Sequence, residues 1–252
     1  SRILLSSSRT TMGEGEYVES LKILDSVSNT NVLDNETFWL KLEEINTLGI
    51  LKGNTEDYLE ARNILKSGLL KTKDRKFEKG SYNEKRLVNW VAGLNGNISV
   101  TYLRENKPDS ALYYLQEVEK RNSFLLDHCE EYLLHEFKAQ AYVQKKDFNS
   151  AEKSMNKAVT ICDNFEGKPL LAVNAFYFGQ IYNGRKEYKK AQQVLFNAIP
   201  SYESHQKGTV EYIDYYKHLA SAYKGLNKLD SSSIYLETVS YTHLRAHETQ
   251  FD

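Results

Sequence analysis

Proline, cysteine and long apolar runs are scarce in this sequence. Its 252 residues include 3 prolines, 13 glycines and 2 cysteines. Because proline and glycine interrupt helices, their scarcity favours long helices over many-turned β structure. Cys129 and Cys162 lie in helical patterns, so we interpret them as small buried residues and not as a disulfide framework. No apolar run reaches the roughly 18–20 residues that a membrane-spanning helix needs, and no membrane span is expected.

An excess of charge of either sign is also missing. The chain has 33 basic and 34 acidic residues and a net charge of −1. This balance provides no broad electrostatic attraction for nucleic acid or an anionic membrane, so neither is predicted as a partner. The apolar fraction of 40% and the mean hydropathy of −0.59 are typical of an elongated fold with a large surface.

Motifs of common catalytic and nucleotide-binding sites are absent too. The chain contains no GxxxxGKS or GxxxxGKT loop, GxGxxG turn, GxSxG elbow, HExxH helix or CxxC pair. The nearest cluster is DHCEEYLLHE, in which His128 and His135 are seven residues apart. On a helix this spacing is about 10 Å, which is too far for both to bind one metal ion. We therefore predict no enzyme, no catalytic or metal-binding residues and no cofactor.

A repeat with a period of about forty residues is the main positive signal. The complete copies have a small residue, a tyrosine three positions later, a polar turn, and then an aromatic or apolar residue followed three positions later by alanine or serine. Two upstream copies are weaker: one has Lys52 in place of the tyrosine, and the first is partial. The clearest copy has Gly179, Tyr182, Tyr188 and Ala191, with Leu195 and Ala198 after them. The preceding copy has Ala139, Tyr142, Phe148, Ala151, Met155 and Ala158. The positions equivalent to Ala191 in the other copies are Ser20, Ala61, Ala111, Ala151 and Ser232.

The parts of each copy have a physical logic. The small residue and the tyrosine mark one face of a first helix, and polar turns such as QKKD and GLNKLD follow it. Pro108 suits the first turn of a second helix, because its missing N–H is not needed there. Asp147 is expected to cap the helix that carries Ala151 and Met155. In that helix, alanine lets two backbones approach, and leucine or methionine one turn later fills the space between units.

These small-x-x-Tyr and aromatic-x-x-Ala elements resemble the tetratricopeptide repeat, a helix-turn-helix unit that stacks into a solenoid. The resemblance extends from Ser8 to Leu236 and is most specific in the last three complete units. It implies an all-α, right-handed helical-hairpin solenoid of about five to six repeats, with a period near 40 in place of the usual 34 or so. It also implies a non-catalytic scaffold for protein–protein interactions.

The predicted organisation has four parts. Residues 1–70 hold N-terminal repeats, the first of them partial, and residues 87–238 hold further repeats, the last of them truncated. The interval from Ala61 to Ala111 is 50 residues, and its excess falls in residues 71–86, which contain seven basic and three acidic residues. We interpret 71–86 as a polar loop or a hinge between two subdomains. Binding of an acidic partner or of phosphate is the alternative.

The fourth part, residues 239–252, carries His243 and His247 four positions apart. On a helix this spacing would place two imidazoles on one face, as a metal site requires. However, residues 239–249 read VSYTHLRAHET, which matches the translation of a common transposase-type sequencing adapter. We therefore expect a non-native tail and an internal fragment of a longer protein, and no metal site.

Proteins that resemble this repeat bind their partners in a concave groove lined by the first helix of each unit. The small residues of successive copies form a stripe along the first helices. The side chains that lie beside this stripe are expected to line the groove. Its aromatic, amide and charged groups suit an extended peptide or a partner helix, and a solvent-facing stripe that binds nothing is the alternative. The lysine- and asparagine-rich clamp of co-chaperone members is not reproduced. The predicted groove residues are Leu133, Glu136, Gln140, Val173, Phe176, Gln180, Asn183, Asp214, Lys217 and Ser221.

Two functional interpretations remain open. In the first, the chain is the sensory or oligomerising part of a longer bacterial signalling protein, because units such as NKPDSALYYL resemble repeat regions that precede histidine-kinase or helix-turn-helix output domains. In the second, the chain is a self-contained receptor that binds a peptide in its groove. Both predict a protein or peptide partner, and both are compatible with homo-oligomers. The cytoplasm is the favoured compartment, and the periplasm is the alternative for part of a membrane-bound sensor.

Overall fold

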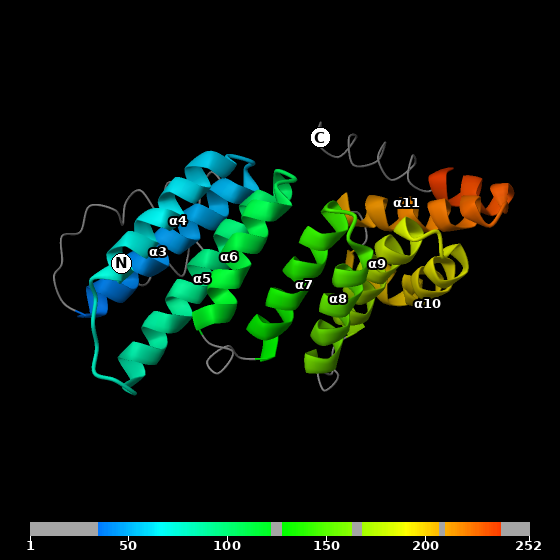
Figure 1. The fold of residues 1–252 in the computed structure, drawn as a ribbon. Helices are drawn as coiled ribbons and strands as arrows, with labels where there is room; N and C mark the ends of the chain where they lie inside the picture. The colour runs from blue at the N-terminus through cyan, green and yellow to red at the C-terminus, as the bar shows by residue number, and fades with distance from the viewer. Residues whose placement is uncertain (1–34, 122–127, 163–167, 207–209, 238–252) are drawn as a thin grey trace. The chain divides into compact units, whose positions relative to one another are not determined.

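The computed structural model describes residues 35–121, 128–162, 168–206 and 210–237 of the chain. The chain divides into two compact units, residues 1–130 and 131–252. Every regular element in the described ranges is a helix, which confirms the all-α prediction (Figure 1). The partial first repeat and the 239–252 tail, with His243 and His247, lie outside the described residues.

The described part of the first unit is built from helical hairpins. They are α3 (Asn35–Asn54) with α4 (Tyr58–Lys73), and α5 (Tyr82–Arg104) with α6 (Pro108–Arg121). Pro108 is the first residue of α6, as predicted. One buried cluster joins three of these helices: Trp39, Leu42 and Ile45 of α3 pack with Leu65 of α4 and with Leu94 and Ile98 of α5.

Further hairpins make up the described part of the second unit. They are α7 (His128–Gln144) with α8 (Phe148–Cys162), α9 (Lys168–Gly184) with α10 (Tyr188–Gln206), and α11 (Val210–Gly225) with the helical residues 229–237. The succession of hairpins in both units confirms the predicted helical-hairpin repeat. Each hairpin places its small residue on the first helix and its alanine or serine on the second. The tyrosine three positions after the small residue is present in every described hairpin except the first, where α3 has Lys52.

The turn inside each hairpin has the same geometry. In the turn between α7 and α8, the Lys146 N–H donates to the Val143 carbonyl and the Asp147 N–H donates to the Tyr142 carbonyl, both at 2.9 Å. These bonds end the first helix in a Schellman motif, whose central residue has a left-handed backbone. The Asp147 side chain accepts from the Ser150 N–H at 3.1 Å, which confirms the predicted cap of α8. The left-handed residues of the turns are Glu56, Asn106, Lys146, Lys186 and Asn227.

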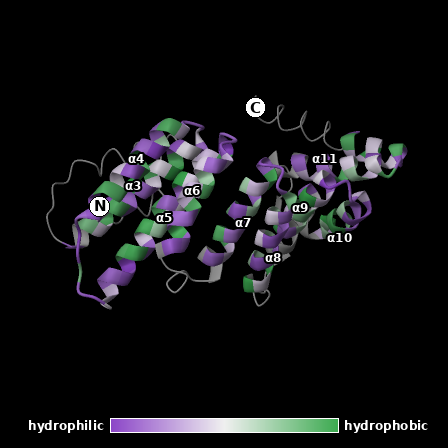
Figure 2. Ribbon diagram, in the orientation of Figure 1, coloured by the Kyte–Doolittle hydropathy of each residue, from purple (hydrophilic) through white to green (hydrophobic). Residues whose placement is uncertain are grey.

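The small residues of the repeat are buried where helices pack. Ala151, Met155 and Ala158 of α8 are fully buried, and so are Ala191 and Leu195 of α10. Figure 2 shows that the helices carry both hydrophobic and hydrophilic residues, as amphipathic helices that bury one face do. The residues that recur with the repeat period are therefore those at the packing contacts between helices.

Successive hairpins of the second unit are joined by an aromatic ring on glycine. The Phe148 ring, at the start of α8, lies so close to Gly184 of α9 that a Cβ on Gly184 would overlap it. Tyr188, at the start of α10, has the same relation to Gly225 of α11. The aromatic position of the repeat thus packs on the end of the first helix of the next hairpin.

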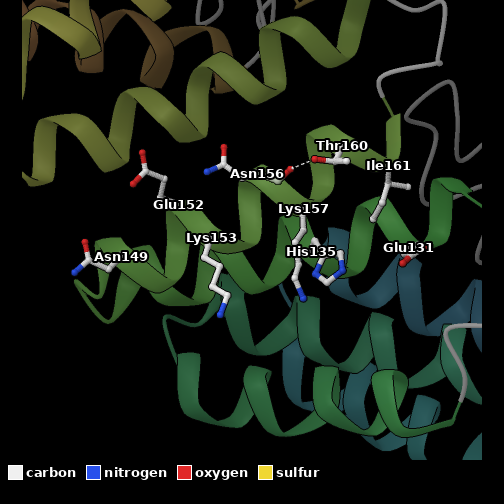
Figure 3. A pocket seen from close by; sticks show the side chains of 9 residues that line it. All are labelled: Glu131, His135, Asn149, Glu152, Lys153, Asn156, Lys157, Thr160 and Ile161. Carbon is white, nitrogen blue, oxygen red and sulfur yellow. Dashed lines mark hydrogen bonds between the residues drawn. The ribbon is translucent and has the colours of Figure 1, made fainter.

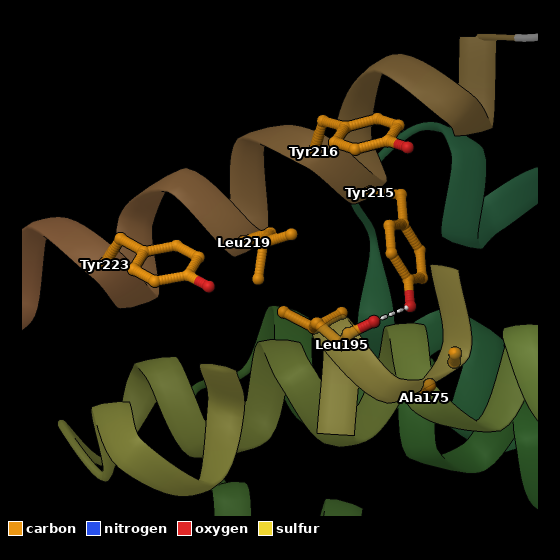
Figure 4. Packing of buried hydrophobic residues seen from close by; sticks show 7 residues of the cluster. Ala175, Leu195, Tyr215, Tyr216, Leu219 and Tyr223 are labelled. Atoms are coloured by element: carbon orange, nitrogen blue, oxygen red, sulfur yellow. Dashed lines mark hydrogen bonds between the residues drawn. The ribbon is translucent and has the colours of Figure 1, made fainter. Parts of the chain in front are cut away.

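An aromatic cluster fills the packing between α9, α10 and α11 (Figure 4). The Tyr215 ring is fully buried there, and its hydroxyl donates to the Leu195 carbonyl at 2.6 Å. Burial raises the pKa of Tyr215 far above its usual range, so the phenol stays neutral. Tyr216 and Tyr223 each stack on Tyr235 of the last helix.

The connection between α4 and α5 packs against α3. Phe77 stacks on Trp39 with a centroid separation of 5.4 Å. The Arg75 guanidinium lies 4.8 Å from the centre of the Phe38 ring, and Arg86 lies 4.6 Å from that of Trp39. Of the predicted segment 71–86, residues 71–73 end α4 and residues 82–86 begin α5, and the whole segment lies inside the first unit. Two of its basic side chains thus rest on aromatic faces.

Candidate protein-binding groove

The ten predicted groove residues lie on α7, α9 and α11, which are the first helices of successive hairpins in the second unit. Their exposure differs along the stripe. Leu133 is 41% exposed, whereas Glu136 is only 9% exposed. Lys217 and Ser221 of α11 are exposed. The half-buried members are Gln140, Val173, Phe176, Gln180, Asn183 and Asp214.

Glu136 is the most buried of these residues and connects α7 to α9. Its carboxyl is hydrogen-bonded to the hydroxyl of Tyr177, itself buried on α9. Burial raises the pKa of Glu136 to about 7, and the hydrogen bond from Tyr177 opposes this shift. The group therefore titrates near neutral pH, which sets it apart from an ordinary surface carboxylate.

Phe176 belongs to the packing between α9 and α11 and not to an open surface. Its ring stacks on Tyr215 at 6.4 Å and meets the His218 ring edge-on at 5.4 Å. His218 is half-buried, and burial lowers its pKa, so that the imidazole is neutral at pH 7. Phe176 thus supports the groove wall and offers little free surface to a partner.

Asn183 also bridges α9 and α11. Its Nδ2 donates to the His218 carbonyl at 2.8 Å. Its Oδ1 is buried and has no hydrogen-bond partner among the described residues. A buried acceptor without a donor costs about 1–3 kcal/mol, so this oxygen is an unsatisfied polar atom at the contact between α9 and α11.

At the last described first helix, the stripe becomes charged. Asp214 and Lys217 of α11 form an ion pair at 3.0 Å, one helical turn apart. Such exposed pairs contribute little to stability and are free to rearrange around a ligand. The stripe therefore runs from an exposed leucine on α7, through amides on α9, to an ion pair on α11.

The structure adds residues to the site that the stripe did not include. Tyr132 of α7 donates its hydroxyl to Asn174 Oδ1 of α9 at 2.9 Å. Tyr177 and His218 each follow a predicted groove residue by one position, and each contacts a neighbouring first helix. Tyr177 and His218 could have been found from the sequence, because each is an aromatic residue or a histidine that directly follows a predicted groove residue.

A separate polar hollow of about 690 Å³ is lined by α7 and α8 (Figure 3). Lys153 and Lys157, one turn apart on α8, line it together with Glu131 and the buried His135 of α7. None of the ten predicted groove residues lines this hollow. In the described ranges, no group of three or more His, Cys, Asp and Glu side chains is arranged to hold a metal ion.

No helix in the described part of the chain is both long and apolar enough to cross a membrane.

Comparison with known proteins identifies the class of repeat. The family model of the tetratricopeptide repeat matches residues 134–165, which include most of the α7–α8 hairpin. The hairpin within residues 134–165 is thus similar to a tetratricopeptide repeat. No curated protein matches the chain by sequence.

Several solved structures share the fold of this chain. BtubC (BKLC) from P. vanneervenii matches with a TM-score of 0.66 and 14% identity over 98% of this chain and 92% of its own. NprR in complex with its cognate peptide NprX matches with a TM-score of 0.69 and 14% identity over 93% of this chain and 64% of NprR. A tetratricopeptide repeat protein from Parabacteroides merdae matches with a TM-score of 0.62 and 14% identity over 96% and 79% of the two chains. At this identity the likeness establishes the fold.

Proposed function

We propose that this chain is a non-catalytic scaffold that binds a segment of a partner protein along α7, α9 and α11. The observation that carries the proposal is the amide-rich centre of the stripe, where the half-buried Gln140, Gln180 and Asn183 lie on α7 and α9. The fold supports it, because tetratricopeptide-type solenoids are interaction surfaces. NprR, which shares the fold, was solved with a bound peptide.

The chemistry of the stripe favours a peptide with a free backbone. An extended peptide presents N–H donors and carbonyl acceptors at regular intervals, and side-chain amides can pair with both. Gln140, Gln180 and Asn183 supply such amides on two adjacent first helices. Leu133, exposed at one end, offers an apolar contact for a side chain of the same peptide.

For the biological context, we propose that the chain serves as the sensory or oligomerising repeat region of a longer bacterial signalling protein. The polar forty-residue units support this reading. The alternative is a self-contained peptide receptor. The coding sequence of the source genome distinguishes them: an output domain encoded in the same reading frame supports the first and rejects the second.

The groove is tested by selecting peptides from a random display library on the full chain and measuring their affinity for variants. Gln180→Ala and Asn183→Ala should each weaken binding about tenfold, which corresponds to about 1.4 kcal/mol. Gln193→Ala, at an exposed position of α10, is the matched control and should leave affinity unchanged. Equal affinity for all three variants would reject the groove.

A further inference from the structure

The first unit contains a second surface, distinct from the groove of α7, α9 and α11. A hollow of about 720 Å³ is bounded by α4, the N-terminal half of α5, and α6. Most of its lining is apolar, although it opens to solvent. The apolar lining residues that carry the argument are Leu69, Leu70, Val88, Val91, Tyr113 and Tyr114.

An extension of α5 helps to build this hollow. The helix begins 17 residues before Ser99, its small repeat residue, since it starts at Tyr82. By the same count, α7 begins at His128, 11 residues before Ala139. Compared with the described part of α7, residues 82–87 are an addition at the start of α5, and Leu87 at their end lines the hollow. This addition accounts for part of the 50-residue interval between Ala61 and Ala111.

Internal comparison of the repeats shows that the exposed apolar residues here are unusual. Leu70 is 68% exposed and Tyr113 is 59% exposed. The position of Leu70, nine residues after the repeat alanine, holds Lys120, Thr160 and Pro200 in the other hairpins. The position of Tyr113, two after that alanine, holds Asn63, Lys153, Gln193 and Ile234. The repeat mostly places polar residues at these sites, so its framework does not require a leucine and a tyrosine flanking one hollow.

The charged residues around the hollow are mainly cations. Lys66, Lys73 and Arg75 line it, and Glu117 is the one carboxylate in the described lining. Glu117 is paired with Lys120 at 2.7 Å. Lys66 lies 6.0 Å from the centre of the Tyr114 ring, and neither Lys66 nor Lys73 forms an ion pair among the described residues. The rim therefore presents uncompensated positive charge beside an apolar floor.

We propose that the α4–α5–α6 hollow docks an acidic amphipathic segment of a partner protein. Apolar side chains of the segment fill the floor between Leu70 and Tyr113, and its carboxylates pair with Lys66 and Lys73. Tyrosine is a typical anchor at protein interfaces, and an apolar hollow suits the apolar face of an amphipathic segment. The cationic rim favours a segment with negative charge. The volume lies within the range of about 300–1,000 Å³ that binding clefts occupy.

The proposal is tested on the full chain with synthetic fluorescent peptides of about twelve residues, with leucine at helical spacing and glutamate elsewhere. A second peptide replaces every glutamate by lysine, and a third replaces every leucine by serine. Fluorescence anisotropy should show binding of the glutamate–leucine peptide and at least about tenfold weaker binding of the other two. Equal binding of the lysine and glutamate peptides would overturn the proposal.

Variants locate the binding site. The first two introduce residues that another copy of the repeat has at the equivalent positions. Leu70→Thr and Tyr113→Lys reproduce the residues of the α8 positions and should each weaken binding about tenfold. Leu59→Thr removes an equally exposed leucine from α4 outside the hollow and should leave binding unchanged. The double change Lys66→Glu with Lys73→Glu should reverse the preference to the lysine peptide. Circular dichroism confirms that each variant is folded.

Two further outcomes would overturn the proposal. One is that Leu70→Thr and Leu59→Thr weaken binding equally, since binding would then follow general hydrophobicity. The other is that sodium dodecanoate binds at Leu70 and Tyr113 while no peptide does, since the hollow would then hold a single-chain amphiphile. Neither outcome affects the amide-rich groove of the second unit, which is tested by Gln180→Ala and Asn183→Ala.

Discussion

The ring of Phe148 lies against the backbone of Gly184, and this contact joins the first hairpin of the second unit to the next. Tyr188 repeats the contact on Gly225, one repeat further along the chain. A side chain at either glycine would displace the aromatic ring that packs between the two successive hairpins. The repeat therefore depends on the absence of a Cβ at the ends of α9 and α11.

Gly184→Ala should destabilise the second unit. Overpacking of this kind costs about 1–3 kcal/mol, because the ring and the backbone must both move. The measurement is urea denaturation followed by circular dichroism. Gly93→Ala is the matched control, since Gly93 is exposed in α5 and a Cβ there meets no atom within 4 Å. That variant should be neutral or more stable by up to about 1 kcal/mol. Equal losses from both changes would contradict the ring-on-glycine contact.

Lysine in the left-handed turns should be suboptimal. Lys146 and Lys186 have φ values of 59° and 62°, a region that favours glycine. Lys146→Gly should raise the free energy of unfolding by about 0.5–1 kcal/mol, after the larger unfolded-state entropy of glycine is subtracted. Asn227→Gly should gain less, because asparagine tolerates this conformation. Lys153→Gly, in the middle of α8, should instead lose about 1 kcal/mol. A loss at Lys146→Gly in thermal unfolding would contradict the assigned turn.

The buried hydroxyl of Tyr215 should contribute to stability through its bond to the Leu195 carbonyl. Tyr215→Phe keeps the ring in the aromatic cluster and removes this one donor. The expected loss is about 1 kcal/mol, measured by denaturant unfolding. Tyr113→Phe is the control because Tyr113 is largely exposed, and it should change stability very little. No loss at Tyr215→Phe would mean that water replaces the bond.

The fold followed from the sequence because its signals are local and repeated. Ala151 and Ala191 are buried at the packing contacts, and Asp147 caps α8, as their spacing predicted. The position of each side chain around the first helices was harder to infer. Phe176 belongs to the stripe by spacing, yet it packs on Tyr215 of α11. That contact depends on how two hairpins stack, which a period along one helix does not encode.

The burial of Glu136 was unpredictable for the same reason. A glutamate in a polar stripe suggests a solvated charge, and only the approach of α9 removes it from water. That the ten stripe residues form one binding surface therefore remains a prediction. The hollow of the first unit was missed because Leu70, Tyr113 and Leu87 are far apart in the sequence. Leu70 and Tyr113 depart from the mostly polar residues that the repeat places at their positions elsewhere, and Leu87 belongs to the addition at the start of α5.

Glu136 should make the stability of the chain pH-dependent near neutrality. Its pKa in the folded protein is about 7, against 4.5 for an unperturbed glutamate, so the folded state holds this proton more tightly than the unfolded state. Stability from this group is greatest when both states are protonated. It falls as the pH rises from about 4.5 to 7 and is constant above that range. The upper limit of the loss is about 3 kcal/mol, since one pKa unit corresponds to about 1.4 kcal/mol.

Glu136→Gln should remove this dependence, because the amide keeps the shape and a hydrogen-bonding oxygen for Tyr177 but does not ionise. Urea denaturation at intervals from pH 5 to pH 8 measures the difference between the variant and the original chain. The variant should be the more stable at pH 8, by up to about 3 kcal/mol, and nearly equal at pH 5. Glu237→Gln, at an exposed position of the last helix, controls for the loss of one negative charge. Parallel pH profiles for the original chain and Glu136→Gln would show that the carboxyl is solvated, and that α7 and α9 do not enclose it.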